Sequence, residues 1–365
     1  MNIKSLLLGS AAALIAVSGA RAADAVVVAE PEPAEYVKIC DVYGAGYFYI
    51  PGTETCLRIG GYVRYDIGVG DREGVQDVFH SADPTQFNDT YHKNARFTLK
   101  TWTGQETELG TLKTYTETRF NFGNGSGPED NVTTSDTFDS VHRAGNKGVS
   151  LNFAWIQLGG LRVGKDESAF DTFIGYAGNV IDDTLVPYGD FDTNVIQYYF
   201  DAGNGFSAVV SLEEGSGAET IDSYVPHIVG GVKYTQGWGA VTGVVAYNSN
   251  WEEWAGKVRL DVNATNELSL FVIGGYGSDS NVTNNFYKLW DGNWAIWGGG
   301  TYKFNEKTSF NVQASYDEGK TFGLAANVAY DIVPGFTITA EVDYFNKAAG
   351  DFRPAKIDGV GGILR

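Results

Sequence analysis

The fold of this chain is decided by the stretch Leu57-Arg58-Ile59-Gly60-Gly61-Tyr62-Val63-Arg64-Tyr65-Asp66-Ile67. Apolar and polar side chains alternate along it, and a period of two residues predicts a β-strand. An apolar face opposite a charged face fits the edge of a β-sandwich. It also fits a transmembrane β-barrel, in which the apolar face meets lipid and the charged face meets a water-filled lumen. The apolar face would hold Leu57, Ile59, Val63, Tyr65 and Ile67, and the charged face Arg58, Tyr62, Arg64 and Asp66.

The same alternation recurs along the chain and predicts an all-β fold of sixteen antiparallel strands. The composition agrees, because 47 glycines, 14% aromatic residues and only 19% charged residues favour strands joined by many turns. The predicted strands are 57–69, 94–103, 111–122, 148–158, 161–165, 193–200, 206–212, 227–235, 240–247, 254–262, 267–275, 294–304, 308–316, 321–330, 336–344 and 359–365.

The connections between these strands alternate between tight turns and long loops. That alternation is typical of an outer-membrane barrel, which has short periplasmic turns and longer extracellular loops. An even number of strands places both ends of the barrel on the periplasmic side. The tight turns are 159–160, 201–205, 236–239, 263–266, 305–307 and 331–335. The long loops are 70–93, 123–147, 166–192, 213–226, 276–293 and 345–358, with shorter members at 248–253 and 317–320.

Aromatic residues gather at the predicted strand ends. Two girdles of aromatic side chains, one at each membrane interface, are expected of a barrel in lipid. An aromatic-rich soluble core is the alternative, but a core would not sort its aromatics to strand ends. Beside the tight turns lie Phe200, Phe206, Tyr234, Trp238, Phe304, Tyr330 and Phe336, and beside the long loops Tyr247, Trp294, Tyr316, Phe322 and Tyr344.

The N-terminus predicts export. Lys4 precedes a short apolar run, and Ala20-Arg21-Ala22 matches an A-x-A cleavage site, so the mature chain would start at Ala23. No later apolar run reaches the ~20 residues that a spanning helix needs. We expect a signal peptide at 1–22, a periplasmic N-terminal segment at 23–56 and a transmembrane barrel at 57–365.

Charge and residue types exclude several function classes. The net charge is −19, and removal of a signal that carries Lys4 and Arg21 would leave −21, which argues against a nucleic-acid partner. We find neither a G-x-S-x-G nucleophile elbow nor a phosphate-binding loop, and the four histidines are scattered. We therefore predict no catalytic residues, no metal site and no cofactor.

The two cysteines, Cys40 and Cys56, are expected to pair. An exported chain meets an oxidising compartment in which disulfides form. A bridge over a loop of this length stabilises by roughly 3 kcal/mol in the chain-entropy model.

The most informative feature of the predicted site is the distribution of its charged residues. Basic residues fall on the inward parity of the early strands, and acidic residues crowd the loop after the fifth strand. If that loop folds into the lumen, its acids face a basic wall across a narrow waist, where the field would filter ions and orient dipolar solutes. An ordinary acidic surface loop is the open alternative. The bases are Arg58, Arg64, Arg96, Lys100, Lys113, Arg119 and Arg162, and the acids are Asp166, Glu167, Asp171, Asp182, Asp183, Asp190 and Asp192.

Three stretches resemble the alphaproteobacterial (brucella-type) outer-membrane porin family. The most specific is residues 43–65, which begin Tyr43-Gly44-Ala45-Gly46-Tyr47 and resemble the family's N-terminal signature. Residues 159–168 resemble the turn and strand before its pore loop, and residues 334–339 resemble a late turn and strand. The resemblance covers essentially the whole mature chain.

The resemblance implies a homotrimer of sixteen-stranded barrels, each narrowed by its third long loop. It also implies passive diffusion of small hydrophilic solutes and ions, in an outer membrane of lipid and lipopolysaccharide. With acids on the loop and a negative chain, we expect a weak preference for cations. Two alternative functions stay open. One is a substrate-specific channel with an aromatic track that could use Tyr62, Trp102 or Trp297, and the other is a membrane-embedded enzyme or adhesin.

The chain departs from the family pattern at its end. Porins of this type usually finish in a strand with a terminal aromatic residue, whereas this sequence finishes Gly361-Gly362-Ile363-Leu364-Arg365. The last predicted strand is shorter than the ~9–11 residues of a spanning strand. A truncated sequence and a short sixteenth strand both fit, and closure against the first strand stays open.

Overall fold

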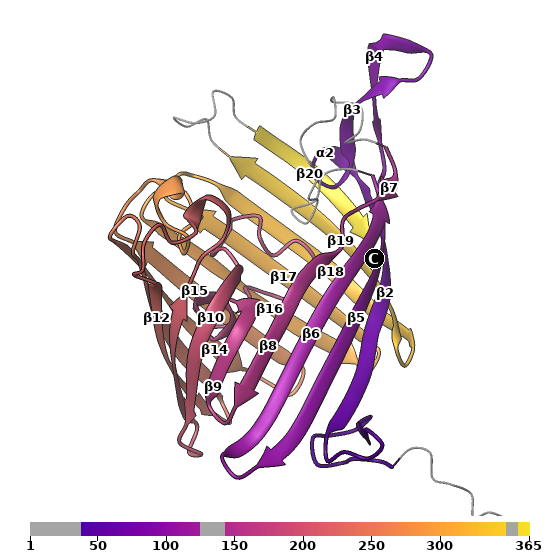
Figure 1. Ribbon diagram of the computed structural model, residues 1–365. Helices are drawn as coiled ribbons and strands as arrows, with labels where there is room; N and C mark the ends of the chain where they lie inside the picture. Colours follow the sequence, from indigo (N-terminus) through magenta and orange to yellow (C-terminus); the bar gives the residue numbers. More distant parts are fainter. Residues whose placement is uncertain (1–37, 125–142, 348–356) are drawn as a thin grey trace, which may run out of the picture. The chain divides into compact units, whose positions relative to one another are not determined.

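Each long strand of the chain pairs with the next in antiparallel register, and the last returns to the first (Figure 1). The computed structural model describes residues 38–124, 143–347 and 357–365. Sixteen strands close into a barrel, as predicted. The predicted signal peptide lies outside the described residues. The barrel strands are β2 (Cys56–Val69), β5 (His92–Thr107), β6 (Gly110–Gly123), β8 (Ser150–Leu158), β9 (Leu161–Glu167), β10 (Asp192–Asp201), β11 (Phe206–Glu213), β12 (His227–Gln236), β13 (Gly239–Asn248), β14 (Glu253–Asn263), β15 (Leu268–Gly277), β16 (Trp294–Asn305), β17 (Thr308–Asp317), β18 (Phe322–Val333), β19 (Phe336–Lys347) and β20 (Ile357–Leu364).

The alternation in β2 divides the two faces of the wall as the sequence predicts. Val63 is 81% exposed on the outer face, whereas Asp66 on the inner face is 3% exposed. Aromatic side chains beside the turns and loops also point outward, among them Phe200, Trp238, Phe304, Tyr330, Phe336, Tyr247, Trp294 and Tyr316. An apolar outer face with aromatic strand ends is the surface that a barrel presents to lipid.

Closure of the barrel depends on a short pairing. β20 pairs with β19 over eight residue pairs but with β2 over three, from Ile67 opposite Leu364 to Val69 opposite Gly362. The seam has a further link, because Arg365 Nε donates to Asp66 Oδ1 at 2.7 Å. The sixteenth strand is therefore eight residues long and begins at Ile357, two residues before its predicted start.

The first long loop contains more structure than the sequence predicts. We expected an irregular loop over 70–93, but it holds the helix α2 (Gly70–Glu73) and a hairpin of β3 (Val75–His80) and β4 (Asp83–Thr90). The α2 turn lies against the inside of β20, where a Cβ at Gly361 would come within 2.7 Å of Glu73 Cγ. Glycine at this position therefore permits the helix to pack onto the wall.

The short remaining elements belong to the loops and the N-terminal segment. They are β1 (Phe48–Tyr49), β7 (Gly145–Asn146), α3 (Ala169–Thr172), η1 (Gly217–Glu219) and η2 (Val282–Asn284). Cys40 and Cys56 form the predicted disulfide, which ties the N-terminal segment to the start of β2. Within the described ranges, no helix is both long and apolar enough to cross a membrane.

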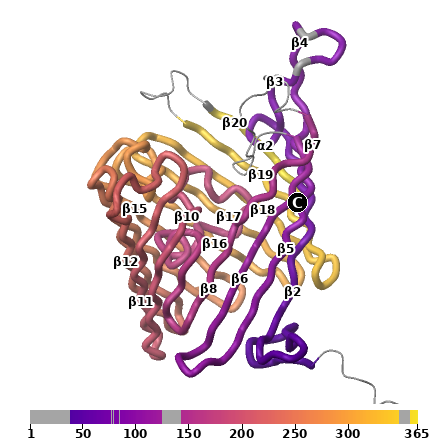
Figure 2. The backbone as a smooth tube through the Cα atoms, in the orientation of Figure 1, coloured from indigo at the N-terminus to yellow at the C-terminus, as the bar shows by residue number. Residues whose placement is uncertain are grey.

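The core of the molecule lies inside the barrel. It combines wall residues with residues of the loop between β9 and β10, whose backbone runs within the ring of strands (Figure 2). Phe170 and Val186 of this loop are fully buried together with Trp297 of β16 and Ala255 of β14. The loop therefore folds into the lumen, as the resemblance implies.

Candidate functional site

The in-folded loop, residues 168–191 and called L3 below, is fixed to the wall where it begins. Ser168 caps α3 by accepting a hydrogen bond from the Phe170 amide. Glu213 on β11 accepts hydrogen bonds from the Ser168 hydroxyl at 2.7 Å and from the Ala169 amide at 2.9 Å. Tyr287 donates to the same carboxylate at 3.1 Å. Glu213 thus satisfies free donors at the start of a helix, which would otherwise be buried without partners.

A buried ion pair joins α3, at the start of L3, to β14. Lys257 Nζ lies 2.6 Å from Asp171 Oδ1, and both side chains are 0% exposed. The ammonium also donates to the Tyr188 carbonyl at 2.8 Å and lies 4.1 Å from the ring centre of Phe170. Burial raises the pKa of Asp171 to about 7, and the Lys257 ammonium opposes that rise. Removing one partner would leave the other as an uncompensated buried group, so the pair holds L3 in place.

The middle of L3, residues 179–186, is fixed by polar side chains from four consecutive strands. Each reaches a backbone group of the loop, so the loop conformation does not depend on one contact. Trp297 on β16 donates to the Val186 carbonyl at 2.8 Å, Gln313 on β17 donates to the Asp183 carbonyl at 2.7 Å, Asn327 on β18 donates to the Asn179 carbonyl at 3.1 Å, and Glu341 on β19 accepts from the Ile181 and Asp182 amides at 2.5 and 2.8 Å.

Three of the predicted loop acids lie in strands that flank L3. Asp166 and Glu167 end β9, and Asp192 begins β10. Each has a partner close by: Asp166 pairs with Arg162 at 2.6 Å, Glu167 accepts from the Tyr176 hydroxyl, and Asp192 pairs with Lys165. Of the three, Asp166 is the one that the structure brings together with a predicted wall base.

Three further predicted acids lie within L3 itself. Asp182 pairs at 2.9 Å with Arg72 of α2, which links the first long loop to L3. Asp183 accepts from the Tyr188 hydroxyl at 2.7 Å, and burial raises its pKa to about 6. Asp190 accepts from the Phe191 amide at 2.9 Å, and burial raises its pKa as well. These acids are therefore engaged in local contacts of the loop.

The predicted bases lie on the inner face of β2, β5, β6 and β9, interleaved with acids that our predicted site did not include. Glu117, 2% exposed, pairs with Lys100 at 3.1 Å and with Arg119 at 2.8 Å. Asp66 pairs with Arg64 at 2.9 Å. Arg96 donates to Asn121 Oδ1 at 2.8 Å.

Arg58 and Lys113 differ from the other five bases. Both are exposed, and within residues 38–124, 143–347 and 357–365 neither makes a hydrogen bond or an ion pair through its side chain. Arg58 lies 4.6 Å above the ring of Trp102. These two cations, at the end of the wall nearest the tight turns, remain available to solutes.

The side chains that hold L3 were absent from our predicted site. Glu213, Lys257 and Glu341 all lie on the inward parity of their strands, which the alternation of apolar and polar residues could have revealed. The sequence could not show that L3 covers this half of the wall. That coverage turns inward polar residues of β11 to β19 into partners of the loop.

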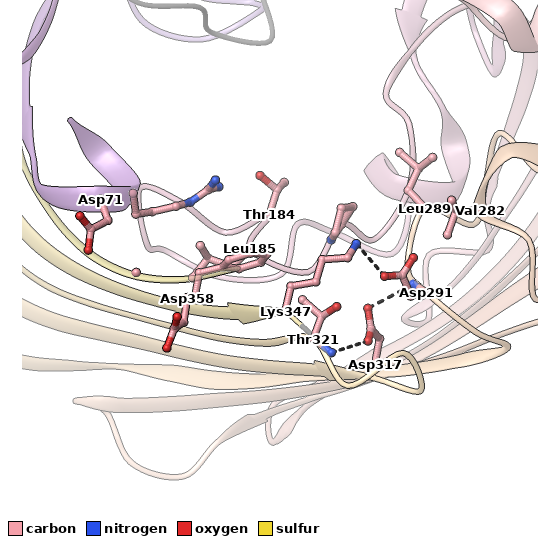
Figure 3. Close-up of a pocket in the computed structure, with 14 residues that line it drawn as sticks. Asp71, Thr184, Leu185, Val282, Leu289, Asp291, Asp317, Thr321, Lys347 and Asp358 are labelled. Atoms are coloured by element: carbon pink, nitrogen blue, oxygen red, sulfur yellow. Dashed lines mark hydrogen bonds and ion pairs between the residues drawn. The ribbon is translucent and has the colours of Figure 1, made fainter. Parts of the chain in front are cut away.

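A cavity of about 500 Å³ lies at the long-loop end of the lumen (Figure 3). L3 contributes Thr184, Leu185 and Pro187 to its lining. Lys347 pairs with Asp291 at 2.6 Å, and the buried Asp317 accepts from the amides of Thr321 and Asp291. Four carboxylates, those of Asp71, Asp291, Asp317 and Asp358, line this outer vestibule beside two cations, Arg72 and Lys347.

Carboxyl groups from three elements meet beside the vestibule. Glu73 of α2 lies against Asp182 of L3, and Asp343 on β19 lies against Glu341. Asp343 is 0% exposed, and neither of its carboxylate oxygens has a hydrogen-bond partner. Burial and the neighbouring Asp182 raise the pKa of Glu73 to about 7. In the described part of the chain, no group of three or more metal-binding side chains is placed to hold an ion.

Comparison with known proteins agrees with this architecture. A family profile described as "Porin subfamily" matches residues 24–358. The chain is 51% identical over 376 residues to "Porin Omp2b" of Brucella suis biovar 1 (strain 1330) and to that of Brucella melitensis biotype 1, covering 100% of this chain and 99% of each relative. The outer membrane channel DcaP of Acinetobacter baumannii shares the fold at 16% identity and a TM-score of 0.60, over 87% of this chain and 98% of that one. A triple mutant of the Rhodopseudomonas blastica porin matches at 13% identity and a TM-score of 0.54, over 84% of this chain and 99% of its own.

The family assignment follows from the profile match and from identity over the full length. It agrees with the barrel, the outward apolar face and the in-folded loop. It also identifies the chain as a channel protein of the bacterial outer membrane rather than an enzyme. The chain belongs to the Porin subfamily.

Proposed function

We propose that this porin is a general diffusion pore for small hydrophilic solutes and ions, weakly selective for cations, that works as a homotrimer. The observation that carries the proposal is the placement of L3. Its contacts fasten it to β11, β14 and β16 to β19, on one side of the lumen. The opposite wall keeps exposed cations such as Arg58 and Lys113, as expected where water reaches the wall.

The cation preference rests on the outer vestibule. Long loops of outer-membrane barrels are extracellular, so a solute entering from outside meets this region first. Four carboxylates against two cations in its lining raise the local concentration of cations. The bases of β2, β5 and β6 oppose this effect further along the path. We therefore expect the preference to be weak.

The test is current through the purified protein in a planar bilayer with a salt gradient across it. Ohmic steps grouped in threes are expected for an open trimer, and a reversal potential of cation-selective sign for the proposed preference. An anion-selective sign would contradict the preference and leave the pore intact. A folded, inserted protein without conductance would contradict the pore itself.

The trimer and its lipid surroundings are parts of the same proposal. The outer face carries large apolar side chains such as Val63 and Val258, which suit lipid, lipopolysaccharide acyl chains or a second barrel. Light scattering of the unheated protein in detergent is expected to give three chains per particle. A single chain per particle would contradict the trimer.

A substrate-specific channel remains the second candidate, because one stretch of the wall carries contiguous aromatic side chains. Trp102 lies 5.4 Å from Tyr115, and Tyr115 lies 5.6 Å from Trp155, between ring centres. Trp297, which we considered for such a track, is instead fully buried beneath L3. Saturable transport of one solute class would favour this candidate over general diffusion.

A further inference from the structure

The aromatic side chains form part of an ordered row that crosses four strands. Arg58 on β2 is the register partner of Trp102 on β5, Trp102 is that of Tyr115 on β6, and Tyr115 is that of Trp155 on β8. Register partners on one face of a sheet lie side by side, so the four side chains are neighbours on the lumen wall. The guanidinium of Arg58 thus stands at one end of an aromatic strip.

A second row lies two residues nearer the tight turns on the same face. Gly104 is the register partner of Lys113, which is that of Gln157, and Gln157 is that of Arg162. Two residues along a strand span about 7 Å, so the Lys113 ammonium is anchored directly beside the aromatic strip. The cations Arg58 and Lys113 therefore flank the same apolar surface from two sides.

The two cations have unused binding capacity. Arg58 is stacked on Trp102, which holds its planar fork of donors while leaving those donors without a partner in the described chain. Lys113 is exposed and likewise unbonded through its ammonium. By contrast, Arg162 lies 4.0 Å over the ring of Trp155 but already donates to Asp166 and Gln157.

We propose that Arg58, Trp102, Lys113, Tyr115 and Trp155, called the inner shelf, form a binding subsite for small anions that carry a ring. A carboxylate would accept charge-assisted hydrogen bonds from Arg58 and Lys113. The ring would pack on the aromatic strip, where Trp and Tyr offer large, half-buried apolar surfaces. This inference rests on the proposed pore, because the subsite faces its lumen, and it names a solute class that the pore retains.

The proposed subsite requires both a negative charge and a ring on the same solute. An anion without a ring gains the charge contacts alone, and a ring with a positive charge is repelled by both cations. Selectivity for the combination distinguishes a built subsite from a generally basic wall. It also distinguishes the inner shelf from the outer vestibule, whose lining is mainly acidic.

The experiment measures binding to the full chain in detergent by fluorine NMR, using 4-fluorobenzoate as the ring-bearing anion. Trifluoroacetate supplies an anion without a ring, and 4-fluorobenzylamine supplies a ring with a positive charge. We expect saturable line broadening for 4-fluorobenzoate, with an affinity at least about tenfold above that for trifluoroacetate. The benzylamine is expected to show no saturable broadening.

Variants assign the signal to the shelf. R58Q/K113Q is expected to weaken 4-fluorobenzoate binding at least about tenfold, and W102L to bring it toward the level of trifluoroacetate. The matched control is K303Q, because Lys303 on β16 is also exposed on the inward parity near a tight turn but lies across the barrel from the shelf. K303Q is expected to bind as the wild type does. The gel mobility of each variant is compared before and after heating, and a shift on heating shows that the unheated variant is folded.

Equal binding of 4-fluorobenzoate and trifluoroacetate to the wild type would overturn the inference. Equal losses of 4-fluorobenzoate binding in K303Q and in R58Q/K113Q would also overturn it, because they would indicate a general effect of lumen charge. Conductance is measured on the same preparations. An open channel without the predicted binding contradicts the subsite alone, whereas binding to a protein without conductance supports the subsite and contradicts the pore.

Discussion

Lys257 on β14 and Lys113 on β6 both stand on the inner face of the barrel, yet their surroundings are opposite. Lys257 is 0% exposed and paired with Asp171, whereas Lys113 is exposed and has no partner in the described chain. The difference arises from L3, which covers β14 and leaves β6 open. Under the loop, a charge must be compensated because desolvation is costly. On the open wall, a charge is hydrated and is free to act on solutes.

The largest expected effect tests the covered wall. We expect Lys257→Met to destabilise the protein by about 3–5 kcal/mol, because Asp171 would remain buried without its counter-ion. The measurement is guanidinium unfolding of the detergent-solubilised protein, together with the voltage at which the channel closes. A lower closing voltage is expected, since L3 loses its buried ion pair with the wall.

Two matched variants decide whether the lost ion pair is the cause. Lys233→Met removes a half-buried inward lysine of β12 whose ammonium lies 5.6 Å from the Phe173 ring and which has no ion pair in the described residues. It is expected to cost about 1 kcal/mol or less. D171N/K257M is expected to recover much of the loss. Equal losses in K257M and K233M would show that the lost ion pair is not the cause of the destabilisation.

A smaller effect on stability is expected at Asp343, a buried carboxylate of the covered wall that has no hydrogen-bond partner. Asp343 has no hydrogen-bond partner, and D343N introduces an amide that can donate to Glu341. We expect a gain of about 1–3 kcal/mol at neutral pH, the cost of one unsatisfied buried polar group. Unfolding measurements on D343N check this. D331N, at the other end of the neighbouring strand β18, is the control and is expected to give no gain.

The same cluster predicts a pH dependence. Glu73 has its pKa raised to about 7, above the ordinary value near 4.3. A raised pKa favours the protonated carboxyl in the folded state, so the contribution of Glu73 to the contact of α2 with L3 is fully present below about pH 4 and is lost as the pH rises through 7. The protection of amides 70–74 against hydrogen exchange, measured relative to the intrinsic exchange rate at each pH, is expected to fall between pH 5 and pH 8. D343N is expected to flatten that change, and an unchanged profile would contradict the role of the cluster.

The strands could be predicted from sequence because alternation is a local property. The predicted strand 57–69 lies within one residue of β2, and 308–316 lies within one residue of β17. The hairpin of β3 and β4 was missed because its pairing is irregular, with register shifts between Val75 and Val78 and beside His80. Such a pairing leaves no regular period for the sequence to show.

The charges could be predicted to face inward, but their partners could not. Asp171 and Lys257 are 86 residues apart, and nothing local to either residue indicates that they meet. The in-folding of L3 was expected from the family resemblance rather than from periodicity. Inward acids such as Glu117 and Asp66 share the parity of the predicted bases, so listing the acids as well as the bases of each inward strand face would have included them in the predicted site.

The smallest expected effect on stability concerns the open wall. We expect Lys113→Gln to change the free energy of unfolding by no more than about 0.5 kcal/mol, since the ammonium is exposed and makes no bond within the described chain. The same variant removes a positive charge from the lumen, so its reversal potential is expected to move toward greater cation preference. Guanidinium unfolding and reversal potential, measured on one preparation, separate the two effects. A hydrated side chain without a partner contributes little to the free energy of unfolding. A loss of stability in K113Q comparable with that in K257M would therefore contradict the contrast between the open and the covered wall.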